Sequence, residues 1–382
     1  MSKATFISTT NIFDDAGNGG VKASREHYNI LCQAFGKDNV QIILFVHNTD
    51  HYDFSKYSGK NRIKIYKRTE GNVKLLLAAL FGCRVYMPWE EKKIIKNIDS
   101  YDPNLIFLDF SVAGRLMRKF SSYRTICYFH NVESDYTLNK MKTDGIRYFP
   151  AYWAAKRNDK WALKADYIMC FNGRDSARLE QLYGRKADYI FPISLPDRFK
   201  EECCITKYEK RLLFLGSCFG PNQDGIEWFI QEVMPQLADE GILLDIVGLG
   251  FEEKKDFYSQ YRNVNVIGTV DKTDDYYYSH AIVVMPIRYG AGMKVKTAEA
   301  MMFGRYIVAS DEALEGYSVI GVDDIKRCNK ADEYISTILE LFKTKNFSSF
   351  SRETRTLYTD NYDTSSVQKS FANTLETITN GA

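Results

Sequence analysis

The chain has 382 residues, and at roughly 100–200 residues per domain this length predicts two domains. Its 51 Lys and Arg residues nearly balance its 49 Asp and Glu residues, which leaves a net charge of +2. No global field therefore draws the protein to nucleic acid or an anionic membrane, and any basic site must be local. The composition, 45% hydrophobic and 26% charged, is typical of globular proteins and excludes wholesale disorder.

The sequence shows no pattern of a secreted or membrane-spanning protein. The eight cysteines form no C-x-x-C pair and no Cys/His cluster at zinc spacing, so we expect reduced thiols. The first residues, MSKATFISTTNIF, lack a charged leader followed by an apolar core, and we expect a cytoplasmic protein. The most apolar window, residues 74–89, is interrupted by Arg84 and is shorter than the ~18 apolar residues of a membrane span. We interpret it as a buried or interfacial helix.

Short β-rich runs alternate with helical patterns along most of the chain, as in βαβ units with parallel sheets. The first half contains predicted strands at 4–9, 40–46, 62–66, 105–110, 124–130, 166–172 and 188–193, and helices at 20–35, 90–99 and 174–183. The alternation stops between residues 192 and 210, and a second series follows. It comprises predicted strands at 211–216, 243–248, 264–268, 281–286 and 306–310, and helices at 224–238, 251–261 and 293–303.

We therefore predict an α/β protein with two Rossmann-like, doubly wound parallel-sheet domains that face a cleft. The N-terminal domain covers residues 1–200 and the C-terminal domain residues 208–350. A polar helical tail, residues 351–382, is expected to bridge the domains, with the last helix returning to the N-terminal one.

The strongest local pattern is the run from Pro286 to Ser310, where a predicted strand ends, the chain turns through Gly290-Ala291-Gly292, and a helix begins. Glycines allow a ligand to approach the backbone, and a helix N-terminus attracts anions. Lys294 and Lys296 add positive charge for a diphosphate, and Glu299 lies on the same face for a ribose diol. The alternative is a glycine-rich turn before a helix, with Lys296 and Glu299 as a surface ion pair.

Other glycine-containing loops also follow predicted strands. Ligands gather outside the carboxyl ends of the strands in open α/β sheets, where all these loops are expected. Glycine is also common in such loops for turn geometry alone, and we assign Gly248-Leu249-Gly250 mainly to that use. The remaining candidates are Gly216-Ser217, Gly268-Thr269-Val270 and, before the first helix, Gly19-Gly20.

His130 ends a predicted strand, and Glu133 follows three residues later. Both side chains would then lie at the carboxyl edge of the first sheet, where a histidine can stabilise or transfer charge near neutral pH. A histidine at a strand end can also be purely structural. The sequence contains no D-x-D triplet to hold a metal against a diphosphate, and no G-x-S-x-G elbow. We expect no metal and no resident cofactor.

Residues 138–164 carry a local excess of five positive charges with interleaved Trp, Tyr and Phe residues. Such a segment suits peripheral contact with an anionic membrane, on its cytoplasmic face, or with a lipid-linked phosphate. The alternative is a solvated helix with an aromatic inner face.

The second half of the chain resembles the donor domain of the GT-B glycosyltransferases, in particular the retaining family 4, also called group 1. The resemblance covers roughly residues 211–318, through LLFLGSCFGPNQDGIEWFIQEVMPQL, DIVGLG, VNVIGTV, AIVVMPIRYGAGMKVKTAEAMMFGRYIVAS and EALEGY. The first half is similar to that family more loosely, through the Gly19-Gly20 loop, the HNVE segment, and ADYIMCFNGRDSARLEQLYG.

This resemblance implies a metal-independent, retaining glycosyltransferase of the hexosyltransferase type. It would transfer a sugar from a nucleotide diphosphate sugar, with UDP favoured over GDP, to a glycan or lipid-linked glycan in surface polysaccharide biosynthesis. His130, Glu133 and Lys296 are the implied catalytic residues. The implied nucleotide-sugar residues are Gly19, Gly20, Gly216, Ser217, Gly268, Thr269, Val270, Gly290, Ala291, Gly292, Met293, Lys294, Lys296 and Glu299. Two alternatives stay open: a sugar-nucleotide epimerase of the same fold, and a catalytically silent nucleotide-sugar-binding partner of another transferase.

Overall fold

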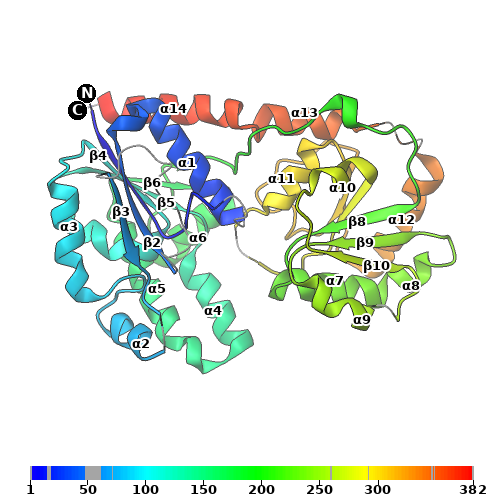
Figure 1. Cartoon of the computed structure of the whole chain (residues 1–382), viewed down its shortest axis with the longest axis horizontal. Helices are drawn as coiled ribbons and strands as arrows, with labels where there is room; N and C mark the ends of the chain where they lie inside the picture. The colour runs from blue at the N-terminus through cyan, green and yellow to red at the C-terminus, as the bar shows by residue number, and fades with distance from the viewer. Residues whose placement is uncertain are drawn as a thin grey trace. The chain divides into compact units, whose positions relative to one another are not determined.

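A computed structural model describes residues 2–14, 19–47, 62–70, 72–258, 260–290, 292–345, 347 and 349–380. The chain divides into two compact units, which we treat separately (Figure 1). Unit 1 comprises Met1–Pro192 with Val367–Ala382, and unit 2 comprises Ile193–Ser366. The division therefore falls at the start of the segment in which the predicted strand–helix alternation stops.

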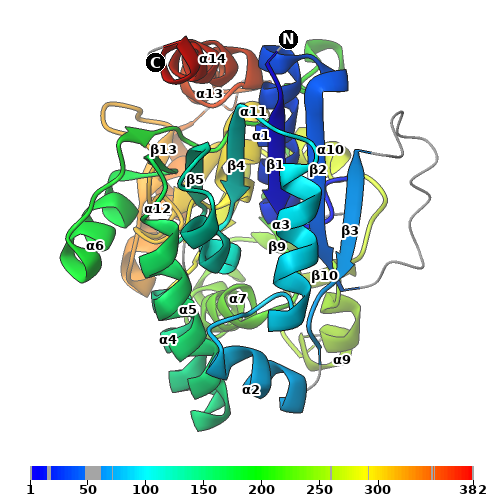
Figure 2. The ribbon, with the colours of Figure 1, turned by 90° about the vertical axis from the view of Figure 1, so that its left-hand side faces the viewer.

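Unit 1 contains a seven-stranded sheet, and every neighbouring pair in it is parallel. The strand order is β3-β2-β1-β4-β5-β6-β7, and Figure 2 shows β3, β2, β1, β4 and β5. The strands are β1 (Ala4–Ser8), β2 (Val40–Val46), β3 (Ile63–Lys67), β4 (Leu105–Asp109), β5 (Arg124–Phe129), β6 (Tyr167–Cys170) and β7 (Tyr189–Ile190). Strands β1, β2 and β4 are buried along their whole length, because helices cover both faces of a doubly wound sheet.

The helices of unit 1 alternate with these strands. They are α1 (Gly19–Phe35), α2 (Asn72–Leu80), α3 (Glu91–Asp99), α4 (Glu133–Asp144), α5 (Phe149–Ala162) and α6 (Gly173–Tyr183). The last helix of the chain, α14 (Thr364–Asn380), contributes its residues from Val367 onward to unit 1. There Phe371 is 1% exposed and stacks on Phe191, with ring centroids 4.6 Å apart.

Unit 2 contains a six-stranded sheet of the same kind, in the order β10-β9-β8-β11-β12-β13 and parallel throughout. Its strands are β8 (Arg211–Leu215), β9 (Leu243–Val247), β10 (Val264–Gly268), β11 (Ile282–Met285), β12 (Tyr306–Ala309) and β13 (Ile325–Arg327). Its helices are α7 (Gly220–Glu232), α8 (Met234–Leu237), α9 (Lys255–Tyr258), α10 (Asp274–Ser279), α11 (Val295–Met302), α12 (Ala331–Thr344) and α13 (Arg352–Asn361).

The two Rossmann-like sheets confirm the predicted fold class, with differences in some helices. The helix predicted at 224–238 begins at Gly220 and is divided at Val233, because Pro235 lies in the first turn of α8 and gives no amide to continue α7. The predicted tail is also divided: α13 belongs to unit 2, and residues from Val367 belong to unit 1. No helix in the described ranges combines the length and the apolar character needed to cross a bilayer.

Candidate functional site

Both sheets reverse their strand order at one point. In unit 1 the reversal lies between β1 and β4, and in unit 2 between β8 and β11. The connections on either side of such a point leave in opposite directions, and the crevice between them is where open α/β sheets bind ligands. Most of the described residues singled out from the sequence lie on loops that follow strands of the two sheets or in the helices that follow those loops.

The loops after β8, β9 and β10 lie side by side in unit 2 and are joined by backbone hydrogen bonds. Cys218, which follows the candidate Gly216-Ser217, donates from its amide to the carbonyl of Leu249 at 2.8 Å. Gly248 donates to the carbonyl of Gly268, also at 2.8 Å. The three glycine-containing loops thus converge, as the sequence predicted from their positions after adjacent strands.

The third of these loops continues from Gly268 into Thr269 and Val270. The Thr269 hydroxyl donates to Glu252 Oε1 at 2.9 Å, and Glu252 also accepts the amide of Gly250. Val270 is half-buried. Glu252 therefore joins the loops after β9 and β10 through side-chain as well as backbone contacts.

Lys296 lies in the first turn of α11, and its ammonium group reaches the loop after β8. Its Nζ donates to Asn222 Oδ1 at 2.6 Å and lies 4.8 Å from the centroid of the Phe214 ring. Asn222 in turn donates to the carbonyl of Ser217 at 2.8 Å. A Cβ atom at Gly216 would meet Lys296 Nζ at 2.6 Å, so glycine is what permits this close approach.

The environment of Lys296 favours its neutral form. Burial lowers the pKa of the ammonium group to about 7, and repulsion from Lys294 contributes less. A bound anion would replace the lost hydration and restore the charge. The charge of this side chain therefore depends on the groups that lie next to it.

Lys294 is held differently from Lys296. Its Nζ lies 2.6 Å from Glu312 Oε1 and 2.8 Å from the carbonyl of Gly292. A Cβ at Gly290 would lie 3.0 Å from Lys294 Cε, and Met293 is buried. Lys294 thus binds to Gly292 of its own loop and to Glu312. Of the two lysines predicted to contact a diphosphate, Lys296 is therefore the better placed. The remaining loop candidate, Ala291, lies outside the described residues.

Glu299 lies one turn after Lys296 on α11 and is buried. Its carboxylate lies near Arg198, in the first residues of unit 2. Its Oε1 lies 3.4 Å from Arg198 Nη2, and its Oε2 accepts from the Tyr277 hydroxyl at 3.4 Å. Arg198 also pairs with Asp274 at 3.2 Å. Glu299 is buried, and among the described residues its ion pair is with Arg198, which differs from the alternative of a surface pair with Lys296.

In unit 1, the reversal point holds a cluster centred on Asp109, the last residue of β4. His130, directly after β5, lies with Nε2 2.7 Å from Asp109 Oδ1, and His27 of α1 lies with Nδ1 2.8 Å from the same oxygen. Ser8, the last residue of β1, donates to Asp109 Oδ2 at 2.9 Å. The ring of Phe110 stacks on His130 with centroids 3.6 Å apart. His130 is thereby fixed in one orientation.

The electrostatics of this cluster favour a carboxylate between two imidazoles. Burial would raise the pKa of Asp109, but the charge and hydrogen bonds of His130 and His27 hold it well below its ordinary value. Burial lowers the pKa of His27, and Asp109 opposes that shift in part. The three potential ligand atoms lie within 4.8 Å of one another, a spacing that a metal ion could also bridge. The direct hydrogen bonds already satisfy the carboxylate.

Among the described residues, Glu133 makes no hydrogen bond to His130; its Oε2 lies 2.5 Å from Arg84 Nη1. The residue that orients His130 is Asp109, which sequence reasoning missed. Gly19 and Gly20 form the first residues of α1, the helix that carries His27. They lie at a helix start, as predicted.

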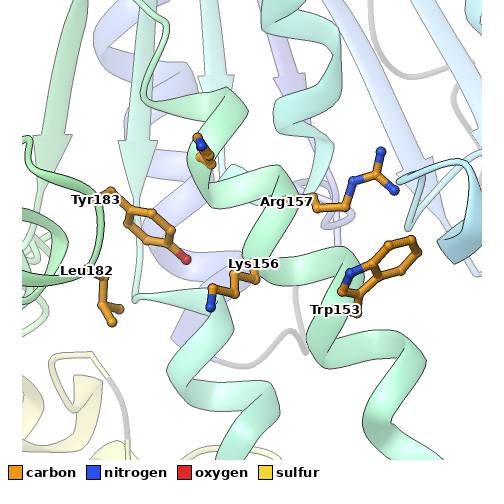
Figure 3. Close-up of a pocket in the computed structure, with 6 residues that line it drawn as sticks. Trp153, Lys156, Arg157, Leu182 and Tyr183 are labelled. Atoms are coloured by element: carbon orange, nitrogen blue, oxygen red, sulfur yellow. The ribbon is translucent and has the colours of Figure 1, made fainter.

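The basic and aromatic segment 138–164 forms the end of α4, the following turn and α5. A pocket of about 480 Å³ lies against it, lined by Trp153, Lys156, Arg157, Lys160, Leu182 and Tyr183 (Figure 3). Arg157 lies 4.7 Å from the Trp153 ring centroid and 4.8 Å from that of Trp161. Trp153 is 39% exposed, so the aromatic residues do not all form an inner face.

Several residues of these sites carry no signal in a single sequence. Asn222, Arg198 and Glu312 contact the predicted residues but lie 74, 101 and 18 positions from them in the sequence. Asp109 could have been noticed as a carboxylate at the end of an otherwise apolar strand. His27 lies inside a helix, where nothing distinguishes it from a core residue.

Comparison with known proteins identifies the class. Residues 209–344 match the family model described as Glycosyl transferases group 1. The solved structure of sucrose-phosphate synthase from Thermosynechococcus elongatus matches with a TM-score of 0.74 at 14% identity, covering 100% of each chain. HepE from Anabaena, in complex with UDP, gives 0.65 at 13% identity over 98% of this chain and 100% of that one. WaaG, a lipopolysaccharide glycosyltransferase, gives 0.65 at 14% identity over 97% and 99%. No curated protein sequence matches.

The fold and the matched domain define the protein as a glycosyltransferase of the GT-B fold. Within that class, its second unit carries a Glycosyl transferases group 1 domain. The predicted resemblance, fold and enzyme class are thus confirmed.

Proposed function

We propose that the protein transfers a sugar from a UDP-sugar to a glycan or lipid-linked glycan in surface polysaccharide biosynthesis. The reaction retains the anomeric configuration and needs no metal ion. The observation that carries this proposal is the meeting of Lys296, Asn222 and Gly216 at the reversal point of the unit 2 sheet. A lysine with a lowered pKa, beside a glycine and at a helix start, suits a diphosphate.

The choice of donor and acceptor is supported by the related structures. HepE was solved with UDP-glucose, and the pneumococcal O-GlcNAc transferase GtfA with UDP and GlcNAc. WaaG and the galactosyltransferase WaaB act in lipopolysaccharide synthesis. For this chain, Glu299 would accept the ribose hydroxyls, and the loops from Gly216, Gly268 and Gly290 would lie against the nucleotide sugar.

During transfer the bond from the anomeric carbon to the diphosphate breaks, and a bond to the acceptor oxygen forms on the same face of the sugar. The acceptor proton passes to the departing phosphate. Lys296 and the amides at the start of α11 stabilise the negative charge that develops on that phosphate. In unit 1, Asp109 holds His130 in a fixed orientation for the acceptor side of the reaction. Glu133, which is paired with Arg84, is a weaker candidate than His130 for contact with the acceptor.

The proposal is tested first by ligand binding, since a ligand that binds only the native state raises its stability. Thermal unfolding is followed with UDP, GDP and ADP, and we expect UDP to give the largest shift. Transfer is then measured with UDP-sugars and glycan acceptors in the presence of EDTA. Neither transfer nor slow donor hydrolysis with any sugar nucleotide would contradict the proposal.

The epimerase alternative is separated by omitting the acceptor. Conversion of UDP-N-acetylglucosamine to an epimer under those conditions would favour it over transfer. A chain that binds UDP but neither transfers nor converts any sugar would support the silent partner. The peripheral contact of residues 138–164 with a membrane is part of the proposed function and is developed below.

A further inference from the structure

We propose that α2 and the adjoining end of the α4–α5 hairpin form a surface that inserts into an anionic lipid bilayer. This inference identifies the partner of residues 138–164 as a lipid bilayer. It rests on the proposed function only for the purpose of that contact, which is access to a lipid-linked acceptor. It is carried by an apolar surface on α2, a helix for which the sequence predicts either a buried or an interfacial position.

The outward face of α2 is apolar. Val73, Leu76, Leu77 and Leu80 follow the i, i+3, i+4, i+7 spacing of one helix face, and they are 73%, 48%, 44% and 56% exposed. Phe81, directly after the helix, is 57% exposed. We call these five residues the apolar face of α2. A surface helix in a globular protein normally turns such residues inward, and large exposed apolar patches mark interaction sites.

The opposite side of α2 accounts for its attachment to unit 1. Ala78 and Ala79 are buried. The backbone carbonyls that follow them accept hydrogen bonds from α5 and from the 3-10 helix Ser111–Lys119. Asn158 Nδ2 donates to the carbonyl of Gly82 at 2.9 Å, and Arg115 Nη1 donates to that of Phe81 at 2.6 Å. The helix is therefore fixed in place with its leucines directed outward.

The turn between α4 and α5 extends this apolar surface. Ile146 is 77% exposed, Phe149 50% and Trp153 39%. Both α2 and α4 start from carboxyl ends of strands, β3 and β5, and both lie beyond that edge of the unit 1 sheet in Figures 1 and 2. Exposed aromatic residues beside aliphatic ones are typical of the boundary between lipid tails and headgroups.

The charges around this surface select an anionic bilayer. Lys142, Arg147, Lys156 and Lys160 are exposed, and we call them the basic rim. Within the described part of the chain none of the four forms an ion pair with a carboxylate. Asp159, on the same helix, is fully buried and bound to Ser111 and the amide of Ser134. Each such cation near an anionic membrane strengthens binding by about fivefold.

A second copy of the chain is a less suitable occupant. Pairing two identical faces about a twofold axis would bring two basic rims together, and like charges oppose that contact. A bilayer containing anionic lipid satisfies the rim and the apolar face at the same time. It would also hold His130, at the carboxyl end of β5, on the membrane side of unit 1, where a lipid-linked acceptor would arrive.

The test is flotation of the full chain with vesicles of phosphatidylcholine alone or mixed with phosphatidylglycerol. We expect binding to the mixed vesicles, weakened by salt. The variant Val73→Asp/Leu76→Asp should lose this binding. Replacing Arg147, Lys156 and Lys160 by Gln should weaken vesicle binding by about 100-fold. Because these side chains are exposed, this variant should fold normally, and it tests the surface even if the α2 variant misfolds.

Matched controls come from unit 2. Ile320→Asp replaces a residue that is 96% exposed, and a triple Gln variant replaces the exposed Lys207, Lys272 and Lys343; both should bind like the wild type. The inference is overturned if the wild type ignores the mixed vesicles, if the α2 variant binds them unchanged, or if sedimentation shows a dimer that the α2 variant dissociates. The UDP-induced thermal shift, measured without vesicles, reports on the proposed function separately.

Discussion

At the residue scale, two titratable groups dominate the candidate sites, the half-buried Lys296 and the fully buried Asp109. Lys296 lies beside a glycine that leaves it room, and Asp109 lies between two histidines. Both arrangements bury a charge or a potential charge, which is costly without partners. Such positions are typical of functional sites, and each leads to a pH-dependent prediction.

The first prediction concerns Lys296 and the affinity for UDP. The free lysine has a pKa lowered to about 7, and contact with a diphosphate raises it, so binding takes up a proton above pH 7. UDP affinity should therefore fall as the pH rises above 7, by up to about tenfold per pH unit. Isothermal titration at several pH values measures this. Lys296→Met should bind UDP weakly with a flat profile, whereas Lys343→Met should match the wild type.

The second prediction concerns His27 and stability in acid. Its pKa is lowered in the folded chain, so the unfolded chain binds more protons below about pH 6.5. The stability that His27 contributes is fully present above pH 6.5 and is lost as the pH falls toward its folded pKa, by at most about 1.4 kcal/mol per pH unit. Urea unfolding between pH 7.5 and 5 should show a shallower slope for His27→Phe. The slope of His47→Gln, an exposed histidine, should not change.

At the element scale, α14 shows how a polar tail can be an essential part of a domain. Phe371 is nearly fully buried, and besides Phe191 its ring lies near Phe107 and Tyr128 at centroid distances of 6.2 and 6.4 Å. Arg124 of β5 donates to the carbonyl of Ile378. The helix therefore completes the core of unit 1 from the far end of the sequence.

The third prediction follows from this packing. Phe371→Ala removes a large buried ring and should destabilise unit 1 by about 3–5 kcal/mol. Denaturant unfolding followed by the fluorescence of the tryptophans, of which Trp89, Trp153 and Trp161 lie in unit 1, measures the loss. Lys369→Ala, on the exposed side of the same helix, should unfold like the wild type. Equal stability of the two variants would show that α14 is not part of the core.

At the scale of the whole molecule, each unit carries one of the two clusters. Lys296, Asn222 and Glu299 belong to unit 2, and His27, Asp109 and His130 to unit 1. Each set lies at the reversal point of its own sheet. Under the proposed function, unit 2 would bind the donor and unit 1 would contribute the acceptor side of the reaction.

The fourth prediction separates these two roles. His130→Ala should lower the rate of sugar transfer by at least about tenfold and leave the UDP-induced thermal shift intact. Lys296→Met should diminish both. Transfer rates and melting temperatures are measured on the same preparations. Loss of the UDP shift in His130→Ala would place that histidine in donor binding instead.

The sequence predicted much of the fold and part of the site, and the reason differs between residues. Near-continuous apolar runs revealed strands such as β2 and β4, because strands of a covered parallel sheet are apolar on both faces. Lys296 was found because a glycine-rich turn directly before a helix is a local pattern. The sequence did not predict that Asp109 and His27 meet, since they are 82 residues apart; His27 has no local pattern, and Asp109 has only its place at the end of an apolar strand.

The sequence alone determined the alternation of strands and helices, the glycine-containing loops and the first turn of α11, because each depends on neighbours within a few residues. The tertiary structure decided which residues meet. The β1-β4-β5 order brings Ser8, Asp109 and His130 together, and the hydrogen bond from Lys296 to Asn222 joins the first turn of α11 to that of α7. It also decided that α2 exposes its leucines, because the side that a helix buries depends on what lies beneath it. The two domains expected from a length of 382 residues are thus present, each with one polar cluster at its reversal point.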